Sequence, residues 1–200
     1  MADRERPAIR LATSHDRAAV AAMLARAFAD DPAMAYIFPD PADRAKRLPR
    51  LFALLFESDG PVGMRLVAAG VEGATLWRRP GRSKTGAWEM IRHAPGMVRA
   101  LGGAIGRALN VANAIDAHHP SGDYWYLHIA GCDPQHQGKG IGGALIRDGL
   151  ARAGGLPCYL ETATEKNLGL YRSLGFEVTG DWHVSRGGPR FWSMVRLPNQ

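Results

Sequence analysis

The sequence predicts an α/β fold in which a mixed sheet carries helices on both faces. Apolar residues alternate with polar ones in several short segments and recur at helical spacing in others. These segments follow the order strand, helices, strands, helix, strand, helix, strand, helix, strands. The 200 residues are 46% hydrophobic, which is enough to build the core of one domain.

The first two elements are a short strand and a helix. Ile9 and Leu11 alternate with polar neighbours, and Thr13 or Ser14 is a suitable N-cap for the helix that follows. Apolar residues recur in that helix on one face, which predicts that this face is buried. The run "DDP" is expected to end the helix at Pro32.

A second helix and a hairpin come next. Leucines and phenylalanines of the segment 48–56 share one helical face, and Pro49 fits such a helix only near its first turn or at a kink. Two apolar runs then follow, near 64–69 and 74–77, separated by "EG" and closed by "PG". This pattern predicts the two strands of a hairpin.

The segment 85–120 is helix-like but interrupted. Pro95, Gly102 and Gly106 each weaken or break a helix, so two mobile helical pieces are expected, followed by a loop at "DAHHPSGD". The segment is apolar, which suits either helices packed on the core or a lid that faces a substrate.

The rest of the chain alternates strands and helices. "YWYLHIAGCDP" is aromatic and β-branched, which predicts a strand, and a glycine-rich loop leads from it into a helix that reaches about residue 153. "LPCYLETAT" predicts another strand, and "EKNLGLYRSLGF" a short helix that Gly175 ends. "FEVTGDWHV" and "RFWSMVRL" are expected to form a terminal pair of strands.

The composition narrows the class of protein. There are 25 Lys and Arg against 19 Asp and Glu, and the net charge of +6 favours an anionic partner. The basic residues are scattered, which argues against a nucleic-acid partner. The charged N-terminal residues and the lack of a run of about 18 apolar residues predict a cytoplasmic protein with no membrane partner. Cys132 and Cys158 suit neither a disulfide framework nor a metal site, so no metal is expected.

The loop "DPQHQGKGIGG" at 133–143 is built to hold phosphates, and three kinds of phosphate site compete for it. An NTPase P-loop fails because its spacing is wrong and Ile141 stands where a hydroxyl should bind magnesium. A dinucleotide fingerprint matches formally, but five residues separate the strand from Gly138 and too little chain follows for a Rossmann domain. The third kind is a helix N-terminus whose free amides bind a pyrophosphate that glycines allow to approach closely.

The third kind resembles a known family. The spacing Gln135-x-x-Gly138-x-Gly140 after a strand resembles the acetyl-CoA loop of the GCN5-related N-acetyltransferases, the GNAT superfamily. Downstream, Asn167 and Tyr171 resemble the family's asparagine, which bonds the pantetheine arm, and its tyrosine, which sits by the thioester sulfur. Four residues apart on a helix, these two side chains should share one face.

The resemblance extends to a branch of the superfamily and implies a fold. The part from Tyr124 to the C-terminus resembles the branch that includes puromycin N-acetyltransferase. It implies a single GNAT domain over 1–200 with a twisted, mostly antiparallel sheet: an N-terminal part at 8–84, a variable substrate-side segment at 85–120 and an acetyl-CoA-binding core at 124–200. The residues expected to bind acetyl-CoA are Ile129, Ala130, Gly131, Cys132, Gln135, His136, Gln137, Gly138, Lys139, Gly140, Ile141, Gly142, Gly143, Asn167 and Tyr171.

Acetyl transfer from a thioester to an amine needs a group that stabilises the oxyanion and one that protonates the leaving thiolate. A main-chain N–H near Gly131 or Cys132 is expected to polarise the acetyl carbonyl. Tyr171 is the expected general acid, because a phenol keeps its proton at neutral pH. Cys132 could form an acetyl-cysteine, but a free cysteine more often behaves as a small apolar residue.

The general base is left open between two residues. His128 lies on the strand beside the acetyl site and Glu161 on the neighbouring strand, and either could accept the proton directly or through water. Both also have purely structural interpretations. His118, His119 and Glu165 are weaker candidates.

These observations predict an acetyl-CoA-dependent N-acetyltransferase. The acceptor is expected to be a primary amine of a small molecule, acetylated by direct transfer in a ternary complex. Acetylation of a protein N-terminus or lysine is the alternative within the enzyme class, and a non-catalytic acetyl-CoA-binding module the alternative outside it. A homodimer is left open as the assembly.

Overall fold

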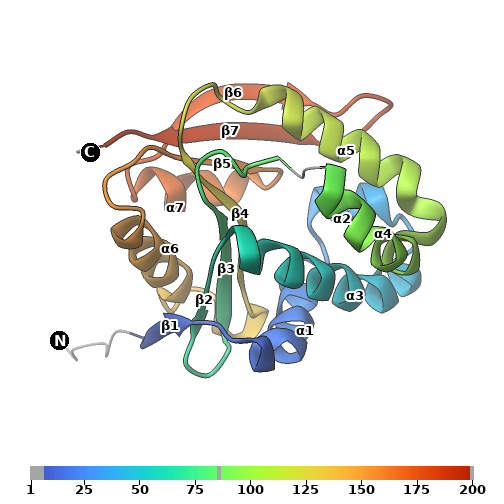
Figure 1. The fold of residues 1–200 in the computed structure, drawn as a ribbon, viewed down its shortest axis with the longest axis horizontal. Coiled ribbons are helices and arrows are strands. Elements are labelled where there is room, and N and C mark those ends of the chain that lie inside the picture. Colours follow the sequence, from blue (N-terminus) through green and yellow to red (C-terminus); the bar gives the residue numbers. More distant parts are fainter. Residues whose placement is uncertain (1–6, 85–86, 199–200) are drawn as a thin grey trace.

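The computed structural model describes residues 7–84 and 87–198, which form a seven-stranded sheet with helices packed on both sides (Figure 1). The strands are β1 (Ile9–Leu11), β2 (Gly63–Ala68), β3 (Gly73–Arg78), β4 (Trp125–Cys132), β5 (Cys158–Thr162), β6 (Glu177–His183) and β7 (Arg190–Arg196). The α-helices are α1 (Arg17–Ala27), α2 (Pro32–Ile37), α3 (Pro41–Asp59), α4 (Ala87–Leu101), α5 (Ile105–His118), α6 (Ile141–Arg152) and α7 (Leu168–Arg172).

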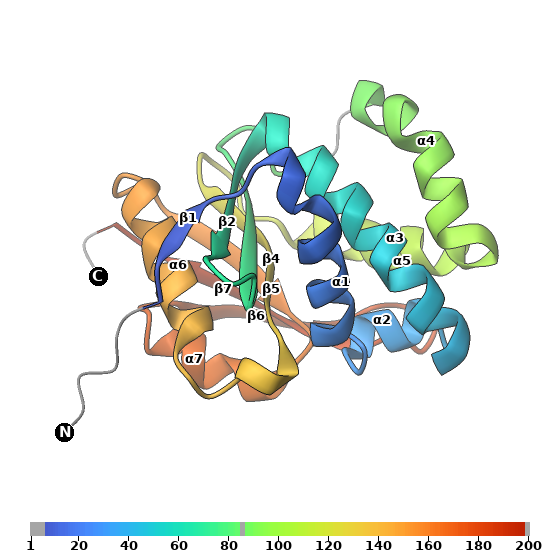
Figure 2. The same ribbon diagram turned by 90° about the horizontal axis from the view of Figure 1, so that it is seen from below.

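The sheet is mixed and mostly antiparallel. Its strand order is β1-β2-β3-β4-β5-β7-β6, and every neighbouring pair is antiparallel except the parallel pair β4 and β5. Helices α6 and α7 cover one face, while α1 to α5 lie on the other (Figure 2). Each face has its own apolar core, one around Phe52 and Leu76 and one around Leu145 and Phe176. The predicted fold class is confirmed.

The pair β4 and β5 separates soon after it forms. The two strands are paired only at Trp125 with Cys158 and Tyr126 with Tyr159, although β4 continues to Cys132. Because a strand edge without a neighbour presents free N–H and C=O groups, the C-terminal half of β4 is open to an extended ligand on its β5 side.

Strand β4 also carries a bulge on its other side. Leu76 of β3 is paired with Ile129, but the next residue, Trp77, is paired with Leu127. The residue skipped is His128, so a bulge lies at the point where the sheet opens.

Most predicted elements are found, with differences at prolines. Thr13 does form a capping box, but at a 3-10 turn that precedes α1. Pro32 starts the unpredicted helix α2, because Asp31 caps it by accepting hydrogen bonds from the amides of Ala33 and Met34. Proline at the first helical position loses no hydrogen bond, which explains why Pro32 can begin α2. The predicted end of the first helix at Pro32 is wrong, because α1 already ends at Ala27.

The segment 85–120 differs from the prediction in where it breaks. Pro95 lies inside α4 without ending it. The same holds for Pro49 in the earlier helix α3, where it lies in the middle of the helix and not in its first turn. Within the described residues 87–118, the helix is interrupted at Gly102, which has φ of +51° and begins the 3-10 turn between α4 and α5. Helix α5 then extends into the first three residues of the predicted loop and ends at His118, and the remaining residues of that loop are not helical.

None of the helices over 7–84 and 87–198 combines the length and the hydropathy that a membrane span requires. Within the same ranges, no group of three or more His, Cys, Asp or Glu side chains is arranged to hold a metal ion.

Candidate functional site

A cavity of about 700 Å³ lies where β4 and β5 have separated. Four parts of the chain surround it: the end of α1 with its connection to α2, residues Ala74 and Thr75 of β3, the end of β4 with the glycine-rich loop and the start of α6, and the segment that leads into α7. Its lining therefore brings together the glycine-rich loop and the pair Asn167 and Tyr171, which are about 30 residues apart in the sequence.

The start of α6 is a helix N-terminus without a cap. Gly140 is the N-cap residue, no side chain caps it, and the first intrahelical bond runs from the Ala144 amide to the Gly140 carbonyl at 3.0 Å. The N–H groups of the first turn are thus available to a ligand. Gly138 and Gly140 have φ of +75° and +83°, a conformation in which a Cβ would be strained.

Asp133 anchors the beginning of this loop. Its carboxylate accepts a hydrogen bond from Arg26 Nε of α1 at 2.9 Å and one from the Gln135 amide at 3.1 Å. The hydrogen bonds from Arg26 and from this amide lower the pKa of Asp133, so it stays an anion. The glycine-rich loop is therefore fixed to α1, on the other face of the sheet from α6.

Most of the residues predicted to bind acetyl-CoA line the cavity. Three do not: Ile129 packs in the core on the α1 side, and Gln135 and Lys139 are exposed to solvent. The predicted residues that line it are Ala130, Gly131, Cys132, His136, Gln137, Gly138, Gly140, Ile141, Gly142, Gly143, Asn167 and Tyr171.

Tyr171 and Asn167 contact the cavity from the same side, as their spacing predicted. Asn167 directly precedes α7, and Tyr171 lies within it. The Tyr171 side chain is only 6% exposed and its ring packs edge-on against Phe176. Burial, followed by the charges of Glu161 and Asp31, raises the pKa of Tyr171, so the phenol holds its proton firmly.

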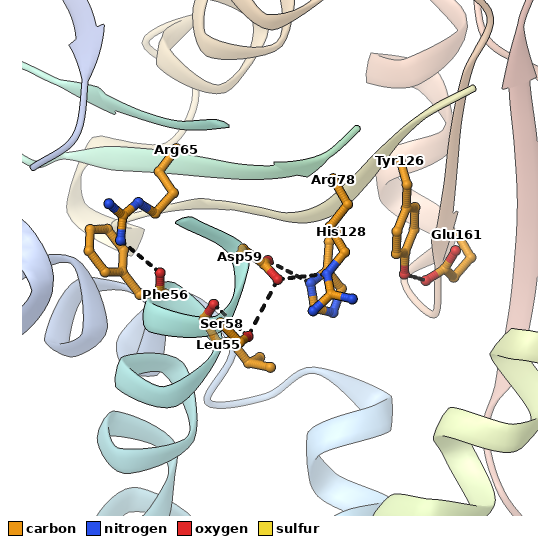
Figure 3. Close-up of polar contacts among 9 residues, drawn as sticks. All are labelled: Leu55, Phe56, Ser58, Asp59, Arg65, Arg78, Tyr126, His128 and Glu161. Atoms are coloured by element: carbon orange, nitrogen blue, oxygen red, sulfur yellow. Dashed lines mark hydrogen bonds and ion pairs between the residues drawn. The ribbon is translucent and has the colours of Figure 1, made fainter. Parts of the chain in front are cut away.

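His128 lies outside the cavity lining, at the bulge of β4. Its Nδ1 atom is 2.7 Å from Oδ2 of Asp59, the last residue of α3 (Figure 3). The side chain is 22% exposed, so one edge of the ring remains open.

Glu161 of β5 also lies outside the cavity lining, and the Tyr126 hydroxyl donates a hydrogen bond to its Oε1 (Figure 3). The other oxygen, Oε2, is buried and has no hydrogen-bond partner among the described residues. Burial raises the pKa of Glu161 to about 8, with a smaller contribution from Asp116 of α5, so this carboxyl is mostly neutral at pH 7.

The weaker candidates for a base have other surroundings. His118 Nδ1 donates a hydrogen bond to the Ala114 carbonyl, and its ring stacks on Trp182 with centroids 4.0 Å apart, which is a packing role. His119 is next to the Tyr124 hydroxyl at 2.8 Å, and burial lowers its pKa to about 4. Glu165 is exposed at the surface.

Two carboxylates near the site were not singled out from the sequence. Asp31 lines the cavity, caps α2 and lies 3.3 Å from the hydroxyl of Thr164. The dipeptide Asp31-Pro32 could have signalled this cap, because aspartate before a proline is a common helix start. Asp59 gave no such signal, since its partners His128 and Arg78 are far away in the sequence.

Comparison with known proteins places this geometry in a family. Residues 100–178 match the sequence model of the acetyltransferase (GNAT) domain family. A crystal structure from Corynebacterium glutamicum, described as histone acetyltransferase HPA2 and related acetyltransferase, is 29% identical and superposes with a TM-score of 0.75 over 98% of both chains. The chain is thus similar to GNAT acetyltransferases, in sequence over residues 100–178 and in fold over nearly its whole length.

Two further relatives, both named as N-acetyltransferases, differ in how much of them the chain covers. The N-alpha-acetyltransferase RimI of Mycobacterium tuberculosis is 46% identical over 56 residues, which are 27% of this chain and 35% of that protein. An uncharacterized N-acetyltransferase of Schizosaccharomyces pombe is 25% identical over 193 residues, covering 89% of this chain and 78% of that protein. The GNAT family uses acetyl-CoA, which agrees with the coenzyme predicted from the loop.

Proposed function

We propose that this GNAT protein transfers the acetyl group of acetyl-CoA directly to a primary amine of a small molecule, in a ternary complex. The observation that carries the proposal is that an uncapped helix start and a buried, protonated tyrosine line the same cavity. The first suits an anionic diphosphate, and the second suits a group that donates a proton.

The proposed binding residues suit the diphosphate, the amide-containing arm and the acetyl carbonyl of the coenzyme. The amides at the start of α6 would hold the diphosphate, and the open edge of β4 at 130–132 would hold the amide-containing arm. Asn167 would bond that arm from the other wall, and a β4 amide near Gly131 or Cys132 would polarise the carbonyl. When bound, acetyl-CoA supplies the activated acetyl group.

The acceptor amine must lose a proton to a general base, for which His128 and Glu161 are the two candidates. A base must be able to accept a proton at the working pH. Glu161 is mostly protonated at pH 7 because its pKa is about 8. We therefore assign the role of general base to His128, which acts directly or through one water. Glu161 then borders the acceptor as a neutral carboxyl.

The closed surroundings support a small acceptor. Helix α5 lies over β5, where the Tyr159 hydroxyl reaches the His118 carbonyl at 3.3 Å. At the far side, Ser185 in the connection between β6 and β7 bonds Asn110 of α5 at 2.9 Å. A peptide would need an open groove here. The likeness of 124–200 to the puromycin N-acetyltransferase branch makes an amine of that kind the first acceptor to test.

A protein acceptor is the second candidate. It is favoured by the relatives themselves, since the names of the Mycobacterium and Corynebacterium proteins refer to N-alpha- and histone acetyltransferases. A thiol-release assay with acetyl-CoA should therefore compare small amines, including puromycin and aminoglycosides, with peptides that have free N-termini or lysines. Turnover of peptides alone would replace the small-molecule proposal.

Binding of the coenzyme can be tested without an acceptor. Acetyl-CoA should raise the melting temperature by mass action, while NAD should not. A stabilising effect of NAD alone would refute the proposed coenzyme. Calorimetric titration would give the affinity.

Gly142→Val is expected to weaken acetyl-CoA binding at least about tenfold, because the side chain would enter the cavity that the diphosphate needs. A Cβ at Gly142 meets only Leu170, at 4.0 Å, so the free protein should tolerate it. Gly106→Val is the matched control, because Gly106 is also helical with open space around it and lies outside the cavity lining. Equal Kd values for the two variants would contradict this location of the diphosphate.

Cys132→Ala is expected to keep kcat within about threefold. Burial raises the pKa of the Cys132 thiol, which disfavours the thiolate that a covalent acetyl-cysteine would require. Loss of activity in this variant, with acetyl-CoA binding retained, would instead favour the covalent route.

A further inference from the structure

A buried ion pair lies directly behind the proposed base. Asp59 is 0% exposed and Arg78 is 3% exposed, and Arg78 Nε donates to Asp59 Oδ1 at 2.7 Å. The second oxygen, Oδ2, is turned to His128 Nδ1, also at 2.7 Å. The carboxylate thus joins three elements: the end of α3, the end of β3 and the bulge of β4 (Figure 3).

Asp59 is ionised in this position. Burial alone would raise the pKa of Asp59, but the charges and hydrogen bonds of His128 and Arg78 outweigh it and hold the pKa below its ordinary value. Since an ionised carboxylate only accepts hydrogen bonds, the nitrogen of His128 that faces it must carry a proton. In a neutral imidazole the other nitrogen, Nε2, then has the free lone pair.

The bulge explains why the histidine can reach both sides. His128 is the unpaired extra residue of β4, opposite the bond between Leu76 and Trp77. Its ring centroid is 5.3 Å from that of Tyr126, whose hydroxyl donates to Glu161. His128 therefore shares a face with the residues that border the proposed acceptor, while its Nδ1 edge is held from behind by α3.

We propose that Asp59 is a positioning residue for acetyl transfer, which holds His128 in the tautomer whose Nε2 accepts the proton of the acceptor amine. This rests on the proposed function. The proton moves from the amine to His128 Nε2 as the C–N bond forms and the C–S bond breaks, and the thiolate takes a proton from Tyr171. Asp59 accepts no proton in this sequence.

The alternative is that Asp59 serves only to satisfy the buried charge of Arg78. Two variants separate these roles, because Asp59→Asn and Arg78→Gln both break the same ion pair, but only the first removes the carboxylate from His128. Asp59→Asn is expected to lower kcat about 30-fold or more with little change in the KM for acetyl-CoA. Arg78→Gln is expected to destabilise the fold while losing much less of kcat.

A double-variant cycle makes the test specific to His128. In a His128→Gln background, adding Asp59→Asn should lower kcat by less than about threefold, because the positioned group is already gone. A full additional loss would overturn the proposal. Because Asp59→Asn breaks the buried ion pair with Arg78, a second variant, Asp59→Asn with Arg78→Met, removes both charges of this pair together and allows the same comparison if the single variant does not fold.

The tautomer can be observed without any acceptor. In ¹⁵N-histidine NMR spectra, His128 of the wild type should show the pattern of an Nδ1–H imidazole, and the Asp59→Asn protein should lose it. An unchanged His128 signal together with unchanged kcat would overturn the role of Asp59. If instead the wild type neither binds acetyl-CoA nor releases thiol with any amine, the proposed function fails, which is a separate outcome from the NMR result.

Discussion

Tyr171→Phe is expected to lower kcat by about 100-fold or more while changing the KM for acetyl-CoA by less than about threefold. Only the hydroxyl group is removed, so the ring can keep its edge-on contact with Phe176. Because burial raises the pKa of Tyr171, the phenol holds a proton at every pH at which the protein would work. The loss should therefore appear in the chemical step, where the thiolate leaves.

The control for Tyr171→Phe is a half-buried tyrosine whose hydroxyl makes a hydrogen bond away from the cavity. Tyr36 of α2 accepts a hydrogen bond from Asn110 Nδ2 at 3.0 Å and does not line the cavity. Tyr36→Phe should keep kcat within about threefold. Steady-state kinetics with saturating acetyl-CoA would measure both, and unchanged turnover of Tyr171→Phe would refute its role as the acid.

Local pattern was sufficient for the parts of the site that lie close together in the sequence. The glycine loop and the pair Asn167 and Tyr171 could be predicted because a helix start and an i, i+4 spacing are properties of a few consecutive residues. Both motifs line the same cavity. The sequence could suggest that they lie together only through its resemblance to a family. The separation of β4 from β5, which creates this cavity, left no signal in either strand.

Longer-range features escaped prediction for a common physical reason. The contact between Asp59 and His128 spans 69 residues, and the bulge that directs His128 exists only against β3. Pro95 was expected to break a helix, but α4 continues through it, since packing on α3 can offset one lost hydrogen bond. Burial, not residue type, decides whether Glu161 or His128 can act as the base.

Glu161 makes the stability of the protein depend on pH. Its pKa is raised from 4.5 to about 8, so between these values the folded state binds a proton that the unfolded state has released. The free energy of unfolding must then fall as pH rises, until it levels off above about pH 8. From pH 6 to pH 9 this single carboxyl should cost about 2–3 kcal/mol of stability.

Glu161→Gln is expected to remove this pH dependence, because an amide has the shape of the protonated carboxyl and never ionises. Denaturant unfolding at pH 6 and pH 9 should show a smaller fall in the free energy of unfolding for Glu161→Gln than for the wild type, by about 2–3 kcal/mol. Glu165→Gln, an exposed change on the neighbouring segment, should keep the wild-type fall. In the mechanism proposed above, a neutral side chain suffices at position 161. Glu161→Gln should therefore also retain kcat within about tenfold at pH 7. A loss of kcat of about 100-fold or more would instead assign the role of base to Glu161 in place of His128.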